Sequence, residues 1–329
     1  MADRPVTMSD VARRLGVSRS AVSFALNNEN QVSDATRQRV LAMASELGYR
    51  PNAGARALAG SKTDLFGLVT DIVTTPFAGD LIAGAQEAFW QQGKSLIIVG
   101  TDTPESPDKR SIEMMLEHRV GGIMFATTTN RAIKLPALLR DVPVVLVHCF
   151  DALGVQPSVV PDEELGGFSA TSLLLERGRR RIGMINLDPD LPAAIGRNAG
   201  YLRALAGAGI DVDPAWVISA GADSDGGYQA AKRLVSILGV DGLFCANDRL
   251  AMGAYDAVRE LGLRVPDDVS VVGFDNQEII AAHLRPALSS VALPFREMGR
   301  MGAEIIMGEH KGEPIRVVVR CPVIERSSV

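Results

Sequence analysis

One face of a short helix predicted near the N-terminus carries groups that suit the recognition of bases. At about 100° per residue, the groups that share this face are Arg19, Ser20, Ser23, Phe24 and Asn27. The opposite face is apolar and consists of Ala21, Val22, Ala25 and Leu26. Hydrogen-bonding groups beside one aromatic ring suit the major groove of DNA. An ordinary amphipathic helix with a solvated face is the alternative interpretation.

A second set of polar residues follows apolar segments that are predicted to be strands. These residues are Asp71, His148, Asn247 and Asp275, and Arg197 joins them from the start of a helix that follows another strand. Open α/β sheets bind ligands at the carboxyl ends of their strands. A guanidinium, an amide and a carboxylate that converge there would suit a small polyhydroxylated ligand, because they supply fixed donors and acceptors.

Each of these candidates also has a structural interpretation. Asn247 is equally consistent with capping the helix that starts at Asp248. Asp275 is consistent with capping or with accepting a backbone hydrogen bond at a strand end. Arg197 needs a partner if it lies near a strand-rich core. Stacking on a sugar ring and packing in the core are both open for the aromatic candidates Phe77, Phe150 and Phe274.

The elements that must position the first set are three short helices. Thr7 and Asp10 resemble a capping box, Gly16 ends the first helix, and Ser18 can cap the second. A third helix is predicted between Ser33 and Gly48. Pro51 can then open a short helix over residues 53–59, which is too short to be stable alone and should fold only on a support such as DNA.

The elements that must position the second set are strands alternating with helices. The apolar segments lie at residues 65–71, 95–100, 121–126, 142–148, 181–187, 242–247 and 269–275. This alternation predicts parallel sheets covered by helices, and its two blocks predict two open α/β lobes. We expect the chain to cross between the lobes near Pro161 and near residues 290–294.

Charge separates the N-terminal segment from the rest of the chain. Residues 1–62 contain 9 Lys and Arg against 5 Asp and Glu, whereas the remainder contains 25 against 34. A basic head on an acidic body directs a nucleic-acid contact to one end. We expect a cytoplasmic protein with buried free thiols at Cys149, Cys245 and Cys321, because no signal peptide, membrane span or CxxC pair is present.

The head and hinge resemble those of the LacI/GalR family of transcriptional regulators. The residues that carry the resemblance are Thr7–Ala12, Gly16–Ser18, Ala21–Ser23, Asn27, Val32–Ser33, Thr36–Arg37, Leu47–Asn52 and Ala55–Ala59. The similarity continues through the body to about residue 325. It implies a helix-turn-helix domain at 1–50, a hinge helix at 51–61 and an effector-binding and dimerisation domain at 62–329.

The resemblance also implies a role for individual residues of the head. Base-reading positions are occupied by Arg19, Ser20 and Phe24, and Leu58 matches a hinge leucine that wedges into the minor groove, a role that coexists with hinge packing. Positions that hold phosphates are occupied by Thr7, Ser18, Ser23, Asn27, Ser33, Thr36 and Asn52.

Phe24 departs from the family pattern, because many relatives carry Arg at this position. A phenyl ring cannot make the bidentate bond of Arg to guanine, but it can contact a thymine methyl group. The half-site should therefore differ from the common family site at that base pair. The competing interpretation is that Phe24 turns inward to the small core of the head.

For the body, the resemblance implies the two-lobed periplasmic-binding-protein type I architecture. Lobe 1 would comprise about 62–161 and 294–321, lobe 2 about 162–291, with a third crossing at 321–323 and the last helix, at about 294–309, in lobe 1. The family's effector-contacting positions match Arg197, Asn247 and Asp275. His148 stands where some sugar-responsive relatives carry Asp. The expected effector-binding set is Asp71, Phe77, His148, Arg197, Asn247 and Asp275.

Enzyme functions find little support in the sequence. It contains no GxGxxG, P-loop, GxSxG or HExxH motif, and its four histidines lack metal-ligand spacing, so we expect neither a cofactor nor a metal. The sequence instead predicts a homodimeric repressor, possibly a dimer of dimers, that binds a near-palindromic DNA operator under the control of a sugar or related metabolite. A cytosolic small-molecule-binding protein or an enzyme on the same two-lobed fold is the alternative.

Overall fold

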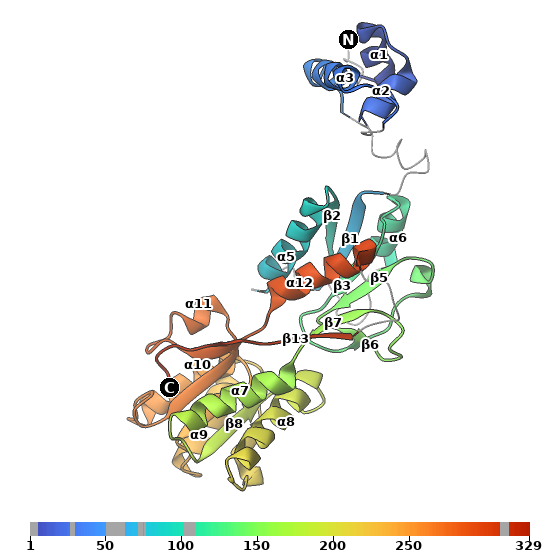
Figure 1. Cartoon of the computed structure of the whole chain (residues 1–329). Coiled ribbons are helices and arrows are strands. Elements are labelled where there is room, and N and C mark those ends of the chain that lie inside the picture. Colours follow the sequence, from blue (N-terminus) through green and yellow to red (C-terminus); the bar gives the residue numbers. More distant parts are fainter. Residues whose placement is uncertain are drawn as a thin grey trace. The chain divides into compact units, whose positions relative to one another are not determined.

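The chain divides into two units, residues 1–63 and 64–329 (Figure 1). The structure, a computed structural model, describes residues 6–26, 30–50, 63–71, 75, 77–101, 109–309 and 316–329. The hinge segment predicted at 51–61 lies outside the described residues, and so do Asn27, Asn52 and Leu58.

The first unit contains the three helices that the sequence predicts. They are α1 (Met8–Leu15), α2 (Arg19–Leu26) and α3 (Asp34–Glu46). The carboxylate of Asp10 accepts hydrogen bonds from the backbone N–H and the hydroxyl of Thr7, at 3.0 and 2.7 Å. Gly16 ends α1 with a left-handed backbone (φ 67°), which glycine adopts without steric cost. Small apolar side chains pack the three helices together: Val11, Ala12, Val22, Ala25, Val40 and Ala44.

The second unit contains two six-stranded sheets, one in each lobe. The lobe 1 sheet runs in the order β13 (Arg316–Val319), β7 (Ser158–Pro161), β5 (Val144–Val147), β3 (Ile123–Ala126), β1 (Leu65–Thr70), β2 (Ser95–Gly100). The lobe 2 sheet runs in the order β14 (Val323–Ile324), β12 (Ser289–Ala292), β11 (Ser270–Asp275), β10 (Gly242–Cys245), β8 (Ile182–Asn186), β9 (Val217–Ser219). The short strands β4 (Ala132–Ile133) and β6 (Phe150–Asp151) pair separately.

Most pairing in these sheets is parallel, as the alternating sequence predicts. All seven predicted segments form strands, and among the described ladders only β12 with β14 is antiparallel. The chain passes from lobe 1 to lobe 2 between β7 and α7, returns between β12 and α12, and passes again between β13 and β14. The fold class is therefore α/β with two parallel sheets, as expected.

Helices cover the faces of both sheets (Figure 1). In lobe 1, α5 and α12 pack side by side, and α6 contacts β1; in lobe 2, α7 pairs with α8 and α9 pairs with α10. Their bounds are α5 (Ala78–Gln91), α6 (Lys109–Glu117), α7 (Glu163–Glu176), α8 (Pro192–Gly207), α9 (Ser224–Ser236), α10 (Asp248–Glu260), α11 (Glu278–Ala281) and α12 (Phe295–Glu304). Two short 3₁₀ helices, η1 (Ala137–Leu139) and η2 (Pro214–Trp216), are also described, and α12 continues into the π-helical segment η3 (Ile305–Glu309).

Glycines allow helices α7 and α8 to approach closely. A Cβ at Gly200 of α8 would overlap the Glu164 carbonyl oxygen, and one at Gly167 of α7 would overlap the Arg197 carbonyl oxygen. The obstacle in both cases is helix backbone, which cannot move without displacing the helix. The packing of α7 on α8 thus depends on residues without side chains.

A buried carboxyl group joins the start of α10 to β12 and to the segment that follows β11. Asp248 is fully buried and accepts hydrogen bonds from the Gln277 N–H and the Ser290 hydroxyl, both at 2.6 Å. Burial, followed by repulsion from Asp275, raises the pKa of Asp248 to about 8. Below this pH the group is a neutral acid.

We expect Gly200→Ala to lower the free energy of unfolding by about 1–3 kcal/mol, because the added methyl group overlaps backbone of α7. Gly207→Ala on the same helix is the matched control, since a Cβ there meets nothing within 4 Å. Thermal or urea unfolding of the full chain measures both. Equal effects of the two substitutions would show that close helix contact does not limit stability.

We expect Asp248→Asn to flatten the pH dependence of stability. An unfolded Asp has a pKa near 4, below the value of about 8 in the folded chain. The stability contributed by the protonated form is therefore present below about pH 4 and lost as the pH rises to 8. Asn can replace the neutral acid, so the variant should be more stable than wild type at pH 8, by at least about 1 kcal/mol. Parallel stability curves for variant and wild type between pH 5 and 8 would contradict this assignment.

Candidate functional site

The predicted DNA-reading face lies on α2. Arg19 and Ser20 are exposed, whereas Ser23 and Phe24 are half-buried. Within the described part of the head, Phe24 belongs neither to the core nor to the partly buried apolar residues that pack against it. This placement favours the outward orientation of Phe24 over the inward one.

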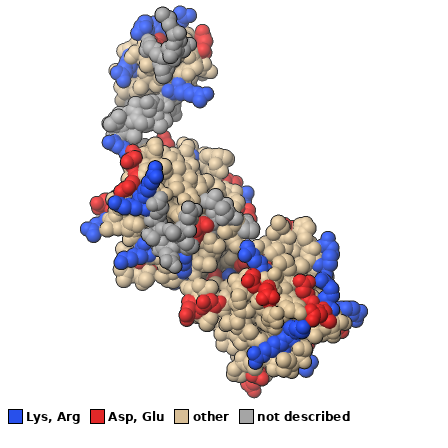
Figure 2. All heavy atoms as spheres, turned by 180° about the vertical axis from the view of Figure 1, so that it is seen from behind, with Lys and Arg blue, Asp and Glu red and all other residues tan. Residues whose placement is uncertain are grey.

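Three of the predicted phosphate-contacting residues cap helices. The Ser18 hydroxyl accepts from the Ala21 N–H at 3.1 Å, and the Ser33 hydroxyl accepts from the Thr36 N–H at 3.3 Å. Thr7 stands at the start of α1. Helix N-termini carry unsatisfied N–H groups and partial positive charge, which suits contact with phosphates. Arginine side chains of the described residues project from the same unit (Figure 2).

In the second unit, five of the six predicted effector-binding residues line one cavity of about 240 Å³ between the lobes. They come from separate elements: Phe77 precedes α5, His148 follows β5, Arg197 lies on α8, Asn247 precedes α10, and Asp275 ends β11. The remaining lining residues are Thr75, Thr128, Thr129, Asn130, Leu187, Leu191, Ala193, Ala222, Arg249, Gln277 and Leu293.

Asp71, the sixth predicted residue, does not line this cavity but supports it. One carboxylate oxygen accepts from the N–H and the hydroxyl of Thr128, at 2.7 and 3.0 Å, and the other pairs with Arg131 at 3.0 Å. Asp71 therefore holds the loop after β3, which supplies Thr128, Thr129 and Asn130 to the cavity wall.

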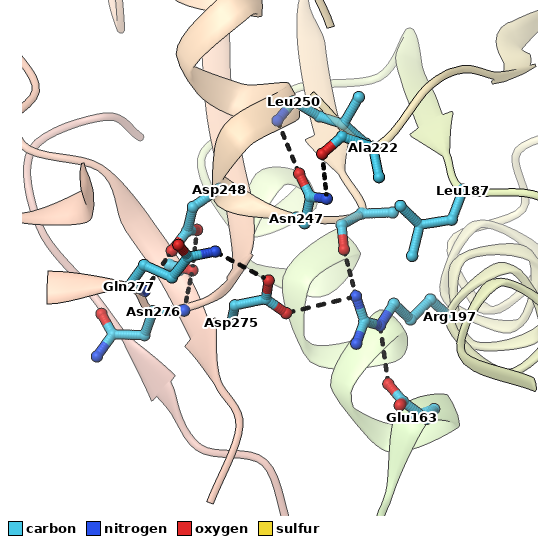
Figure 3. Close-up of polar contacts among 12 residues, drawn as sticks. Glu163, Leu187, Arg197, Ala222, Asn247, Asp248, Leu250, Asp275, Asn276 and Gln277 are labelled. Carbon is cyan, nitrogen blue, oxygen red and sulfur yellow. Dashed lines mark hydrogen bonds and ion pairs between the residues drawn. The ribbon is translucent and has the colours of Figure 1, made fainter. Parts of the chain in front are cut away.

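Arg197 stands at the centre of a buried network in lobe 2 (Figure 3). Its Nε donates to Glu163 at 2.8 Å, its Nη1 donates to the Ala246 carbonyl, and Nη1 lies 3.7 Å from an oxygen of Asp275. Its guanidinium stacks 3.6 Å from the centroid of the Phe274 ring. Burial alone would lower the pKa of Arg197, but attraction by Glu163 and Asp275 raises it overall, so the group stays charged.

Asn247 caps α10, as one of its two interpretations predicts. Its Oδ1 accepts from the Leu250 N–H at 2.7 Å, and its Nδ2 donates to the Ala222 carbonyl at 3.2 Å. Asp275 accepts from the Gln277 side chain at 3.3 Å, and burial raises its pKa to about 6, against the opposing effect of Arg197. The amide and the carboxylate are thus held in place at the cavity wall.

His148 contributes a neutral imidazole from lobe 1. Its Nδ1 lies 2.9 Å from the Thr127 carbonyl oxygen, which can only accept, so Nδ1 carries the proton and Nε2 is a free acceptor. Burial lowers the pKa of His148, which keeps the ring neutral. Its ring packs edge-on against Phe295, with centroids 5.0 Å apart.

Backbone strain concentrates at the same strand ends. In the described chain, the non-glycine residues with positive φ are Arg119 (51°), His148 (56°), Asp275 (95°) and Asn276 (52°), and all but Arg119 lie at or beside the cavity. Such conformations cost free energy and persist where the surrounding structure imposes them. Here they orient side chains at the carboxyl ends of β5 and β11.

Other aromatic candidates have packing roles. Neither Phe274 nor Phe150 lines the cavity. Phe274 is fully buried beneath Arg197, and the centroid of the Phe150 ring lies 4.9 Å from the Arg316 guanidinium. Phe77 does line the cavity, and it contacts Phe295 at 4.9 Å between centroids.

Sequence reasoning missed the loop residues Thr128–Asn130 and the residues Arg249 and Gln277. Arg249 and Gln277 could have been found from their position, because they stand two residues after the candidates Asn247 and Asp275. Thr128–Asn130 lie two to four residues beyond the end of β3, and only the fold of their loop brings them to the cavity. The three cysteines are buried and free, as predicted. No group of His, Cys, Asp and Glu within the described ranges could hold a metal ion. None of the helices described is long and apolar enough to cross a membrane.

Family models match both units. The model of bacterial regulatory proteins of the lacI family matches residues 7–52, and that of the periplasmic binding protein-like domain matches residues 171–329. The ribose operon repressor of Haemophilus influenzae is 30% identical over 302 residues, which cover 92% of this chain and 91% of the relative.

Solved structures show the same similarity over the whole length. The transcriptional regulator CelR in complex with cellobiose is 31% identical, with a TM-score of 0.67, over 99% of this chain and 100% of that one. The lac repressor dimer bound to operator and the anti-inducer ONPF is 25% identical, with a TM-score of 0.79, over 99% of both chains. With three helices in the head, two α/β lobes and these matches, the chain belongs to the LacI family of bacterial transcriptional regulators.

Proposed function

We propose that the chain is a homodimeric repressor whose affinity for a near-palindromic operator is controlled by an effector in the cavity between the lobes. One observation carries the proposal: Arg197, Asn247 and Asp275, brought together from three elements, line one cavity in a chain that also carries a helix-turn-helix head. The ribose operon repressor and the operator-bound lac repressor dimer support the same assignment.

On DNA, α2 lies in the major groove, where Arg19, Ser20 and Phe24 read base edges. The side chains of Thr7, Ser18, Ser23, Asn27, Ser33, Thr36 and Asn52 contact phosphates. Leu58 of each subunit enters the minor groove, and the hinge at 51–61 folds there. Two-fold symmetry of the dimer then requires two half-sites of opposite orientation.

In the cavity, donors and acceptors from both lobes bind a sugar or related metabolite. The complex of CelR with cellobiose favours this class. The ligand is bound without being turned over, because the relatives are named as regulators rather than enzymes. The protein acts in the cytoplasm, where operator DNA is found, and a fusion protein located elsewhere would contradict this.

Arg197 is a poor choice for testing the cavity. Substitution by Ala would leave Glu163 and Asp275 as buried, uncompensated carboxylates, which is strongly destabilising. Asp275 is a better choice, since Asn retains its shape and one of its hydrogen-bond acceptors.

We expect selection from random DNA to return a preference for thymine, not guanine, at the base pair that faces Phe24. The phenyl ring offers an apolar contact to the thymine methyl group and no hydrogen bond to guanine. Phe24→Arg should shift the preference to guanine, with a discrimination of about 1–3 kcal/mol. A guanine preference at this position with the wild-type chain would refute the outward contact of Phe24.

We expect Asp275→Asn to weaken effector binding about 10–100-fold, because a charge-assisted hydrogen bond is lost. Operator affinity without effector should change less than about twofold, since the head is unaltered. A thermal-shift screen of metabolites identifies the effector, and titration calorimetry and DNA-binding assays then measure both affinities.

The control is Asp256→Asn, because Asp256 is exposed and lies outside the cavity. Unchanged effector affinity in Asp275→Asn would place the binding site elsewhere.

A further inference from the structure

We propose that Asn130 is a specificity-determining residue of the cavity, and that with His148 it accepts hydrogen bonds from two hydroxyl groups of an uncharged polyol. The inference rests on the proposed function, because it concerns the ligand of the same cavity. It adds a residue that neither the strand-end pattern nor the family resemblance identified, and it defines which edge of the ligand faces lobe 1.

Asn130 is a buried amide whose oxygen has no partner. The side chain is 3% exposed and lines the cavity from the loop after β3. Its Oδ1 is shielded from solvent and makes no hydrogen bond to the described residues. A buried polar atom without a partner destabilises the folded chain, so an apolar residue would stabilise the ligand-free protein. A ligand that donates to this amide explains its presence.

His148 offers a second acceptor from the same lobe. Its Nε2 is buried and makes no hydrogen bond within the described part of the chain. Because Nδ1 donates to Thr127, Nε2 holds a lone pair and no proton. Asn130 and His148 therefore both line the cavity, and each carries a vacant acceptor that a donor on the ligand would satisfy.

The lobe 1 wall carries no charge at the residues described. Its members are Thr75, Phe77, Thr128, Thr129, Asn130 and the neutral His148. The nearby carboxylate of Asp71 is taken up by Thr128 and Arg131. A carboxylate or phosphate of the ligand would find acceptors there instead of cations, so its hydroxyl groups face this wall.

Charges on the lobe 2 side balance one another. Arg197 and Arg249 line the cavity together with Asp275, and Glu163 lies behind Arg197. Two cations and two carboxylates leave no net charge to be compensated by the ligand. An uncharged polyol therefore fits both walls, with hydroxyl groups that donate to lobe 1, accept from Arg197 and Arg249, and donate to Asp275.

The test uses the full chain and a fixed panel of probes. The neutral probes are D-ribose, D-glucose, D-galactose, cellobiose and myo-inositol, and the anionic ones are D-gluconate, D-galacturonate and ribose 5-phosphate. Thermal shift ranks them, and titration calorimetry measures the best. We expect a neutral probe to bind best, and Asn130→Ala to weaken it about 10-fold or more without lowering the thermal midpoint of the free protein.

Asn198→Ala is the matched control, because Asn198 also has a buried, unpartnered amide oxygen but does not line the cavity. It should leave the affinity of the probe unchanged. The proposal is overturned if no neutral probe binds or if an anionic probe binds better. It is also overturned if Asn130→Ala retains wild-type affinity. A lower thermal midpoint of the free Asn130→Ala variant would indicate a structural role for Asn130 and would likewise overturn the proposal. DNA binding by the same samples tests the proposed function separately: a chain that binds a polyol but no operator would refute that function and leave the role of Asn130 intact.

Discussion

The buried guanidinium of Arg197 is the constraint around which lobe 2 is organised. It touches Glu163 at the start of α7, the carbonyl of Ala246 at the end of β10, Asp275 at the end of β11 and the ring of Phe274. Removing a charge of this kind from water costs several kcal/mol, which only well-placed partners offset. The four partners therefore have little freedom, and they hold Arg197 and Asp275, which line the cavity, in place before any ligand arrives.

This network depends in turn on residues that have no side chain. Gly167 leaves room for the backbone of Arg197, and a Cβ at Gly196 would lie 2.6 Å from the Cβ of Glu163. Larger residues at either position would separate α7 from α8 and pull the carboxylate away from the guanidinium. The glycines thus allow the close packing of α7 on α8 that brings Glu163 within reach of Arg197. The ion pair between these two residues then holds the Arg197 side chain in place at the cavity.

Much of this arrangement could be predicted from the sequence, and the limits have physical causes. The strong strand and helix patterns predicted the α/β class, and strand ends predicted three residues of one cavity, His148, Asn247 and Asp275. Asp71 satisfied the same rule but turned toward Thr128 and Arg131, because a carboxylate binds the nearest available donors. Asn130 was missed because it follows its strand by four residues, and only the folded loop brings it to the cavity. The short strands β7, β12, β13 and β14 were not predicted, because they pair with parts of the chain that are distant in the sequence.

The position of the cavity beside the crossings between the lobes suggests how a ligand would act. Glu163, the partner of Arg197, follows the first crossing, and Leu293, which lines the cavity, lies in the second. A ligand that forms hydrogen bonds to the uncharged wall on lobe 1 and to the charged wall on lobe 2 binds most tightly when it can reach both walls at once. The ligand therefore favours one arrangement of the two lobes over another. The size of this shift is limited by the difference between its binding free energies for the two arrangements. Linkage requires that operator binding change the effector affinity by the same factor as the effector changes the operator affinity. The rigidity of the Arg197 network therefore bears directly on regulation. A flexible wall would adapt to the ligand in either arrangement of the lobes, and the ligand would then not distinguish between them.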